Sequence, residues 1–418
     1  MTFGFRWVLG RPWLVWSVAA LAYVAAVLNR STIGASATEA AQRFSAEPQL
    51  LSVLVVLQVI VYAAAQIPAG ALLDRFGARA VLTVGVSLMA LGQLGVAVTE
   101  QVAAAVAARA VVGAGDAVIF IAVLHLVPNW FDQRRAPLVR QLTSMTGQLG
   151  QIVSAVGFAA AVRHAGWLTA YAGAAALSLL VAMLVVLVVR EHPPGVVVNR
   201  AALPRPTAKA VFTNPGTHLA FFSHMGTQFP CTAFNLLWGI PYLIHAQELS
   251  PTTAGLMLSL TVVSGLVCGP IVGLFSGRWP QYRTGLVLAC VAAMAACWTV
   301  VLVWPGRAPI WLLALLLVVI GAGLPVSTTA FDQARDLNAA QNLGVAQGVT
   351  NIGGYSATFV VIQVVGLLLG AFGGGYGREE FHAAWAVQYL VWLISVVGIV
   401  ISARRTLGAQ RQACVISQ

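Results

Sequence analysis

Charged residues are scarce in this sequence of 418 residues, at 8% of the total. A soluble domain carries about 25%, and 59% of this chain is hydrophobic. So few charges cannot cover a surface that faces water, so most of the surface must face lipid. One spanning helix needs about 20 apolar residues, and apolar runs fill most of the chain. The composition therefore excludes a soluble domain on a single anchor and indicates a polytopic membrane protein.

Cysteine is also rare, with five residues and no C-x-x-C pair. Four of the five lie in apolar runs, where small core residues are expected rather than a disulfide framework or a metal site. A phosphate-binding GxxxxGK loop, an HExxH motif and a nucleophile constellation are missing as well. We therefore expect no enzymatic activity, no cofactor and no metal.

The net charge of +11 would suggest nucleic acid in a soluble protein. Here the positive residues fall in short gaps between apolar runs, so they are interpreted as orientation signals, and no nucleic-acid partner is expected. With both termini in the cytoplasm, 17 of the 23 Lys and Arg residues lie inside, 4 lie outside and 2 lie within spans. This split predicts a multi-pass protein of the cell membrane with both ends cytoplasmic.

Twelve apolar segments predict twelve transmembrane helices, because only a helix or a closed barrel satisfies its own backbone in hydrocarbon. The alternating ten-residue strands of a barrel are absent. A proline-rich polar linker separates two sets of six segments. The segments lie at about 13–37, 50–72, 80–98, 102–126, 138–162, 167–189, 217–245, 252–276, 284–304, 309–330, 343–370 and 383–403. The predicted regions are an N-terminal bundle at 1–189, a cytoplasmic linker at 190–215, a C-terminal bundle at 216–403 and a cytoplasmic tail at 404–418.

The two halves resemble repeats of each other. The sequence FDQRR at 131–135 follows the fourth segment, and FDQAR at 331–335 follows the tenth. Four of these five residues match, 200 positions apart, which indicates an internal duplication. The fold class predicted is therefore all-α, with two pseudo-symmetric six-helix bundles, an arrangement used by secondary transporters.

The loop after the second segment reads GALLDRFGAR at 70–79. It resembles the signature of the major facilitator superfamily between helices 2 and 3. Gly70 and Gly77 would permit close packing and a tight turn. The resemblance implies that Asp74 pairs with a helix end or an arginine of the other half and favours the outward-open state.

Arg75 and Arg79 complete the gating set that the resemblance implies. A cytoplasmic orientation signal alone would explain these arginines, but not the acid or the glycines. The corresponding loop of the second half, GLFSGRWP at 273–280, lacks the acidic residue, which indicates a decayed second clamp.

The fourth segment contains RAVVGAGDA at 109–117. It resembles the R-x-x-x-G-x-G pattern of helix 4, and its acid resembles the anion–cation symporter and sugar-acid permease branch. Arg109 and Asp116 share a helix face but lie about 10 Å apart along the axis, so each should have another partner. Intramembrane charges are costly and normally functional. Desolvation there favours a protonated carboxyl, so Asp116 is the candidate for proton coupling, with a structural hydrogen bond as the alternative.

Helix 1 contains NRST at 29–32, where the same branch has Asp-Arg and the arginine binds a substrate carboxylate. The resemblance thus implies that Arg30 is a substrate ligand, with Asn29 beside it. Counted from their helix ends, Arg30 and Arg109 reach a similar depth, and two positive side chains at one level suit an anion. Because Asn29 replaces the acid, only Asp116 is left for protons, and uniport or anion exchange stays open.

In the second half, helix 7 carries His224, Gln228 and Asn235 at helical spacing on one face, together with His218 and Trp238. Lining a cavity and simple packing are both possible roles for these groups. Helix 11 reads GVTNIGG at 348–354 and resembles the glycine-rich helix 11 of the superfamily, with Asn351 directed at the cavity. No charge lies within the predicted second-half spans, so coupling would rest on the first half.

These features predict a monomeric secondary transporter that works by alternating access and takes up a small organic anion with protons. The predicted substrate ligands are Asn29, Arg30, Arg109, His224, Gln228 and Asn351. The alternatives are a proton-driven exporter of hydrophobic or cationic compounds, and a sensor that kept the fold without transport.

Overall fold

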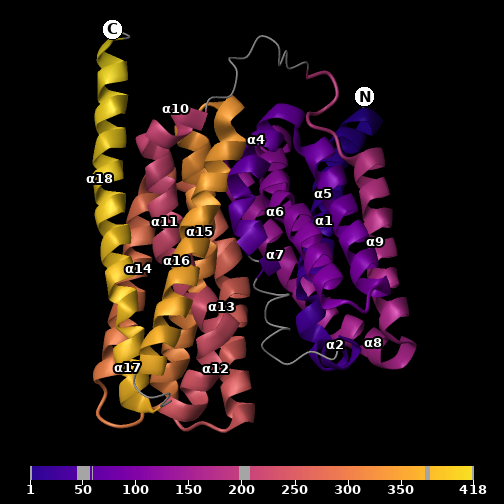
Figure 1. Ribbon diagram of the computed structural model, residues 1–418. Coiled ribbons are helices and arrows are strands. Elements are labelled where there is room, and N and C mark those ends of the chain that lie inside the picture. The colour runs from indigo at the N-terminus through magenta and orange to yellow at the C-terminus, as the bar shows by residue number, and fades with distance from the viewer. Residues whose placement is uncertain (1, 45–56, 59, 197–207, 372–376, 417–418) are drawn as a thin grey trace. The chain divides into compact units, whose positions relative to one another are not determined.

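The computed structural model describes residues 2–44, 57–58, 60–196, 208–371 and 377–416, and their regular structure is helical throughout (Figure 1). Among these residues, ten helical stretches are long and apolar enough to cross a membrane. This confirms the prediction of an all-helical, multi-pass membrane protein. The chain divides into two compact units. Unit 1 comprises residues 1–208 and 341–348, and unit 2 comprises 209–340 and 349–418.

Most helices of unit 1 follow the predicted segments within a few residues, but α1 begins at Thr2, eleven residues before the predicted start at 13. Residues 50–56 and 59 of the predicted second segment lie outside the described residues, and α4 forms its end. The elements are α1 (Thr2–Ala35), α2 (Ala37–Arg43), α4 (Gln66–Phe76), α5 (Ala78–Val98), α6 (Val102–Trp130), α7 (Ala136–Ile152), a π turn (Val153–Phe158), α8 (Ala159–Ala165) and α9 (Trp167–Val188).

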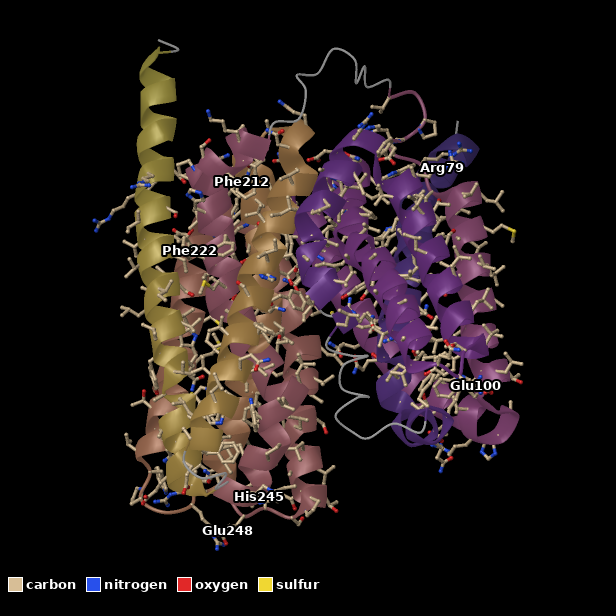
Figure 2. The ribbon with its side chains drawn as sticks, in the orientation of Figure 1. Arg79, Glu100, Phe212, Phe222, His245 and Glu248 are labelled. Atoms are coloured by element: carbon tan, nitrogen blue, oxygen red, sulfur yellow. The ribbon has the colours of Figure 1, made fainter. Side chains whose placement is uncertain are left out.

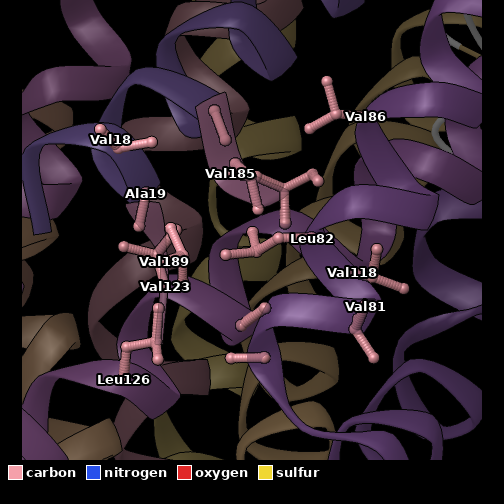
Figure 3. Packing of buried hydrophobic residues seen from close by; sticks show 14 of the residues in the cluster. Val18, Ala19, Val81, Leu82, Val86, Val118, Val123, Leu126, Val185 and Val189 are labelled. Carbon is pink, nitrogen blue, oxygen red and sulfur yellow. The ribbon is translucent and has the colours of Figure 1, made fainter. Parts of the chain in front are cut away.

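The core of unit 1 forms where α5 packs against α6 and α9, and where α1 packs against α6, α7 and α9. Branched aliphatic side chains such as Leu82, Val118 and Val185 fill it (Figure 3). The α5 and α6 backbones approach closely, since a Cβ added to Gly115 would lie 2.4 Å from the Gly85 carbonyl oxygen. Lipid tails are as apolar as this core, so close contact rather than burial from water holds such helices together.

The helices of unit 2 also follow the predicted segments. The start of α16 is grouped with unit 1 and the rest with unit 2. The elements are α10 (Ala208–Thr213), α11 (Pro215–Ala233), a π turn (Phe234–Trp238), α12 (Gly239–Pro241), a second π turn (Tyr242–Ala246), α13 (Pro251–Arg278), a 3-10 turn (Pro280–Tyr282), α14 (Arg283–Val303), α15 (Ile310–Leu337), a 3-10 turn (Ala340–Asn342), α16 (Leu343–Ala371), α17 (Arg378–Trp385) and α18 (Val387–Ile416).

The predicted seventh segment is not one regular helix, because π turns interrupt it on both sides of α12. Pro241 has no N–H to donate, and its ring crowds the carbonyl four residues earlier. A π turn widens the helix just before that position, which relieves this clash. The helix that bears His224 and Gln228 therefore continues into an irregular end.

Two segment ends differ from the prediction. The expected tenth segment stops at 330, whereas α15 continues to Leu337 and contains the whole FDQAR repeat. The span therefore includes Asp332 and Asp336, which corrects the expectation of second-half spans without charge. The expected tail at 404–418 is helical up to Ile416, because α18 continues without a break.

Candidate functional site

The two charges predicted at the substrate and proton sites of unit 1 form one ion pair. Arg30 Nε lies 2.6 Å from Asp116 Oδ2, and Arg30 Nη2 lies 2.9 Å from Asp116 Oδ1. The Arg30 side chain is 26% exposed, while that of Asp116 is 1% exposed. The guanidinium also lies over the Tyr62 ring, with Cζ 4.8 Å from the ring centroid. The guanidinium of Arg30 therefore covers the Asp116 carboxylate and is the more exposed member of the pair.

Arg109 is fully buried and joins α6 to the end of α1. Its Nη1 donates to the Asn29 carbonyl at 3.1 Å and to Thr32 Oγ1 at 3.2 Å. Its Nη2 donates to the Arg30 carbonyl at 2.9 Å and to Gln58 Oε1. As expected, Arg109 and Asp116 have separate partners. Arg109 also reaches the backbone of Arg30 itself, so the two residues lie close together, while their common depth in the bilayer stays a prediction.

Asn29 faces a different helix from its neighbour Arg30. Its Nδ2 donates to the Ala25 carbonyl at 2.7 Å and to Ser178 Oγ of α9 at 2.9 Å. On the other side, Gln93 Nε2 of α5 donates to Thr32 Oγ1 at 3.2 Å. Hydrogen bonds from α5, α6 and α9 thus hold the end of α1, and Arg30 extends from a braced segment.

The signature loop of unit 1 has the two backbone features that its glycines predict. Gly77, between α4 and α5, has φ of +80°, a conformation that only glycine adopts at low cost. A Cβ added to Gly70 would lie 2.3 Å from the Gly344 carbonyl oxygen, so side chains are excluded there. Gly344 lies in the 341–348 stretch grouped with unit 1.

Asp74 meets a helix end, one of the two partners predicted for it. Its Oδ1 accepts from Gly344 N at 2.6 Å and its Oδ2 from Val345 N at 3.0 Å, in the first turn of α16. A helix N-terminus attracts negative charge through its unpaired N–H groups and dipole. Burial nevertheless raises the pKa of Asp74 to about 7, although the two backbone hydrogen bonds act in the opposite direction.

The two arginines of the loop have different surroundings. Arg79 connects α5 to the end of α9, because its backbone N donates to Glu191 Oε1 at 2.7 Å and its Nη2 donates to the Val186 carbonyl (Figure 2). Arg75 lies over the neighbouring Phe76 ring at 5.1 Å. Arg79 thus stabilises contacts inside unit 1, and its predicted gating role stays a prediction.

In unit 2, two of the predicted ligands lie against a glycine of α16. Gly354 N donates to His224 Nδ1 at 3.2 Å, and a Cβ at position 354 would lie 1.7 Å from Gln228 Oε1. That oxygen is buried and accepts no hydrogen bond among the described residues. Asn351, one turn earlier on α16, is 2% exposed. His224 and Gln228 thus meet α16 within unit 2, and Asn351 is buried on the same helix.

Asn235, the third residue of the predicted polar face on helix 7, has a packing role. It lies in the π turn after α11 and donates to Thr261 Oγ1 of α13 at 2.9 Å. Trp238 donates to the Ile362 carbonyl at 2.9 Å, and His218 Nε2 lies 2.7 Å from the Phe212 carbonyl. These three residues are not brought to His224 by the structure.

The sequence profile of the Major Facilitator Superfamily matches residues 19–362, which is most of the chain. The chain belongs to the major facilitator superfamily. As a member of this family it is a membrane transporter. No curated protein matches the sequence, so the substrate has to be argued from the residues themselves.

This transporter has a charged cluster at the second-half loop that lacks the acid. Arg283, 4% exposed, donates to Ser276 Oγ at 2.7 Å and to Asp336 at 2.6 Å. Asp332 accepts from the same Ser276 hydroxyl at 2.9 Å. The acids lie on α15 and not in the loop at 273–280. Comparing that loop with the one at 70–79 therefore does not detect them. The repeat FDQAR was the available signal.

Proposed function

We propose that this transporter takes up a small organic anion together with protons by alternating access, and that Arg30 binds the anion. The observation that carries the proposal is the pair itself: an accessible guanidinium covers an acid that is 1% exposed. An arginine inside a membrane requires a compensating negative charge. Arg30 has one in Asp116, and a substrate carboxylate matches the same bidentate geometry.

The proton and the substrate act on the same guanidinium in this mechanism. Arg30 offers one fork of Nε and Nη2, and Asp116 occupies it. Protonation of Asp116 removes its charge and releases the fork to a substrate carboxylate. The net charge of the site is zero before the exchange, with one cation and one anion. For these groups it is also zero afterwards, with the cation, a neutral acid and a bound monoanion, so the exchange adds no net charge to the site, while the buried Arg109 stays a cation in both states.

The other predicted ligands take supporting roles in the proposal. Arg109 positions Arg30, because its Nη1 and Nη2 donate to the backbone and Thr32 hydroxyl of α1 and to Gln58. His224, Gln228 and Asn351 lie within unit 2, and their predicted contact with the polar part of a substrate stays a prediction. A site built to hydrogen-bond a polar group discriminates strongly against analogues that lack it.

The exporter of cationic compounds is the less favoured alternative. A cationic substrate needs access to an acid, and Asp116 lies behind Arg30 at 1% exposure. The cation would have to displace an arginine that already makes two hydrogen bonds to the same carboxylate. An anion only needs the acid to become neutral. The accessible charge therefore supports an anionic substrate.

A thermal-shift screen of organic acids, amines and drugs on the purified protein tests the substrate class. A carboxylate should stabilise the wild type and lose its effect in Arg30→Gln. The matched control is Arg163→Gln, which removes an exposed arginine of the same unit and should keep the response. Stabilisation by amines alone would favour the exporter. No response to any compound, with no flux in proteoliposomes, would favour the sensor.

Flux of a carboxylate hit into proteoliposomes, with and without a pH gradient, tests the coupling. Asp116→Asn makes position 116 neutral at every pH and leaves only a weaker amide acceptor for Arg30, so the anion should still bind and exchange, but a pH gradient should no longer drive its accumulation. Intact gradient-driven uptake in Asp116→Asn would refute the coupling role. Intact flux in both Arg30→Gln and Asp116→Asn would refute the whole site assignment.

A further inference from the structure

A groove on unit 2 lies apart from the residues proposed for transport. It encloses about 400 Å³ between α11 and α18, two helices that pack side by side (Figure 1). Its lining residues are His218, Phe222, Leu393, Ile394, Val397, Gly398, Ile401, Ser402 and Arg405. The groove is therefore apolar along most of its length, with polar and basic groups gathered at one end.

The groove exists because α18 has a glycine opposite an aromatic ring. Phe222 of α11 lies beside α18 (Figure 2), and a Cβ added to Gly398 would lie 2.4 Å from Phe222 Cγ. The missing side chain lets the ring lie against the α18 backbone and form part of the groove wall. Leu393 and Ile401, at 60% and 46% exposure, stand on the α18 side and are open to the surroundings.

The basic end of the groove is formed by two residues from different helices. Arg405 of α18 is exposed, one turn beyond Ile401. His218 of α11 lies at the same end, with Nε2 2.7 Å from the Phe212 carbonyl of α10. Ser402 adds a hydroxyl beside them. The lining thus changes from aliphatic to basic along the groove. This order is complementary to an amphiphile with an apolar chain and an anionic head group.

The dimensions fit one lipid chain rather than a protein partner. Arg405 and Leu393 are twelve residues apart on α18, or about 18 Å at 1.5 Å per residue. One leaflet of the hydrocarbon core is about 15 Å thick, half of the usual 30 Å. The open groove has a volume of about 400 Å³, whereas a helix of that length and about 10 Å in diameter occupies roughly 1,400 Å³, so a docked helix would lie mostly outside it.

We propose that this groove binds one anionic phospholipid, with its phosphate at Arg405 and one acyl chain along Leu393, Val397 and Ile401. The phosphate oxygens accept hydrogen bonds from the Arg405 guanidinium, whose planar fork of N–H donors matches their geometry. The acyl chain covers the exposed aliphatic side chains of α18. The bound lipid covers the seam between α11 and α18, so its binding should also stabilise unit 2.

Native mass spectrometry of the detergent-purified protein, titrated with phosphatidylglycerol or phosphatidylcholine, tests the proposal. The wild type should retain one phosphatidylglycerol and should bind phosphatidylcholine much more weakly. Arg405→Gln should weaken phosphatidylglycerol binding roughly fivefold, the effect of one basic residue near a membrane surface. Arg404→Gln is the matched control, because it removes the adjacent exposed arginine, which does not line the groove. Arg405→Lys should keep most of the binding.

Four results would overturn the proposal. Equal losses in Arg404→Gln and Arg405→Gln would mean that diffuse surface charge attracts the lipid. Equal binding of phosphatidylcholine would mean that the phosphate is not recognised through its net charge. Competition by glycerol phosphate would indicate a site for a free anion. A dimer mass that disappears as lipid is added would mean that a second copy of the chain covers the groove.

Discussion

Replacing Arg30 by glutamine should destabilise the transporter more than replacing Asp116 by asparagine, because the two partners differ in burial within the protein. Arg30→Gln leaves a carboxylate that is 1% exposed without its cation. Removing one partner of a buried pair costs about 3–5 kcal/mol. Asp116→Asn leaves a guanidinium that is 26% exposed and lies over the Tyr62 ring. A partly exposed cation with an aromatic neighbour should cost less, about 1–2 kcal/mol.

The double variant Arg30→Gln, Asp116→Asn distinguishes this explanation from a general loss of packing. Two amides can replace the ion pair by neutral hydrogen bonds, and such replacements are often close to neutral. The double variant should therefore be about 2 kcal/mol more stable than Arg30→Gln alone. The measurement is the free energy of unfolding in mixed detergent and SDS micelles, followed by circular dichroism. Equal costs for the two single variants, or a double variant less stable than both, would refute the closed ion pair.

Three further predictions concern the same unit. Gly77→Ala should cost about 1–2 kcal/mol of unfolding free energy because its φ is +80°, while Gly173→Ala, a helix glycine with open space around it, should be neutral or stabilising by up to about 1 kcal/mol. Asp74 has a pKa raised to about 7 in the folded protein, so its contribution to stability is lost as the pH rises through 7; the wild type should gain about 1.4 kcal/mol between pH 8 and pH 6, and Asp74→Asn should not. Arg109→Lys keeps the charge but cannot reach both α1 and Gln58, and should cost about 3 kcal/mol in the same SDS titration.

The sequence predicts the helices of this protein well because lipid imposes a simple rule on them. Each span satisfies its own backbone, so a long apolar run is sufficient to identify it. The predicted segments 80–98 and 167–189 end within two residues of α5 and α9. The seventh segment was less regular than predicted, since the π turns around α12 depend on where Pro241 falls relative to the packed neighbours.

Partners inside the bundle were harder to predict than the helices. Axial spacing on α6 was enough to separate Arg109 from Asp116, because both positions lie on one helix. Choosing Arg30 as the partner of Asp116 also requires the rotation of α1 about its axis, which a continuous apolar run does not define. Gln58 was missed as a partner of Arg109 because the apolar run of the second segment does not define the rotation of that segment about its axis either. Arg140 was counted among the 17 cytoplasmic Lys and Arg residues, yet it is fully buried on α7.

The charges of α15 show a second limit. The sequence ends the tenth segment at 330 because hydropathy falls there, but a helix continues wherever its polar side chains find partners. Ser276 and Arg283 provide those partners for Asp332 and Asp336. Such contacts join residues about 50 positions apart, and a local reading of the chain does not detect them.

The hydrogen bonds from Arg109 to the α1 backbone determine which atoms can move when Asp116 is protonated. Arg109 ties the carbonyls of Asn29 and Arg30 to α6, the helix that also bears Asp116. The acid and the backbone of its partner are therefore fixed to each other, and losing the ion pair does not let these two helices separate. Only the Arg30 side chain beyond its Cα is left to respond. We expect protonation of Asp116 to move the Arg30 side chain while the α1 and α6 backbones stay together. The length of that side chain then sets how far the change extends from Asp116.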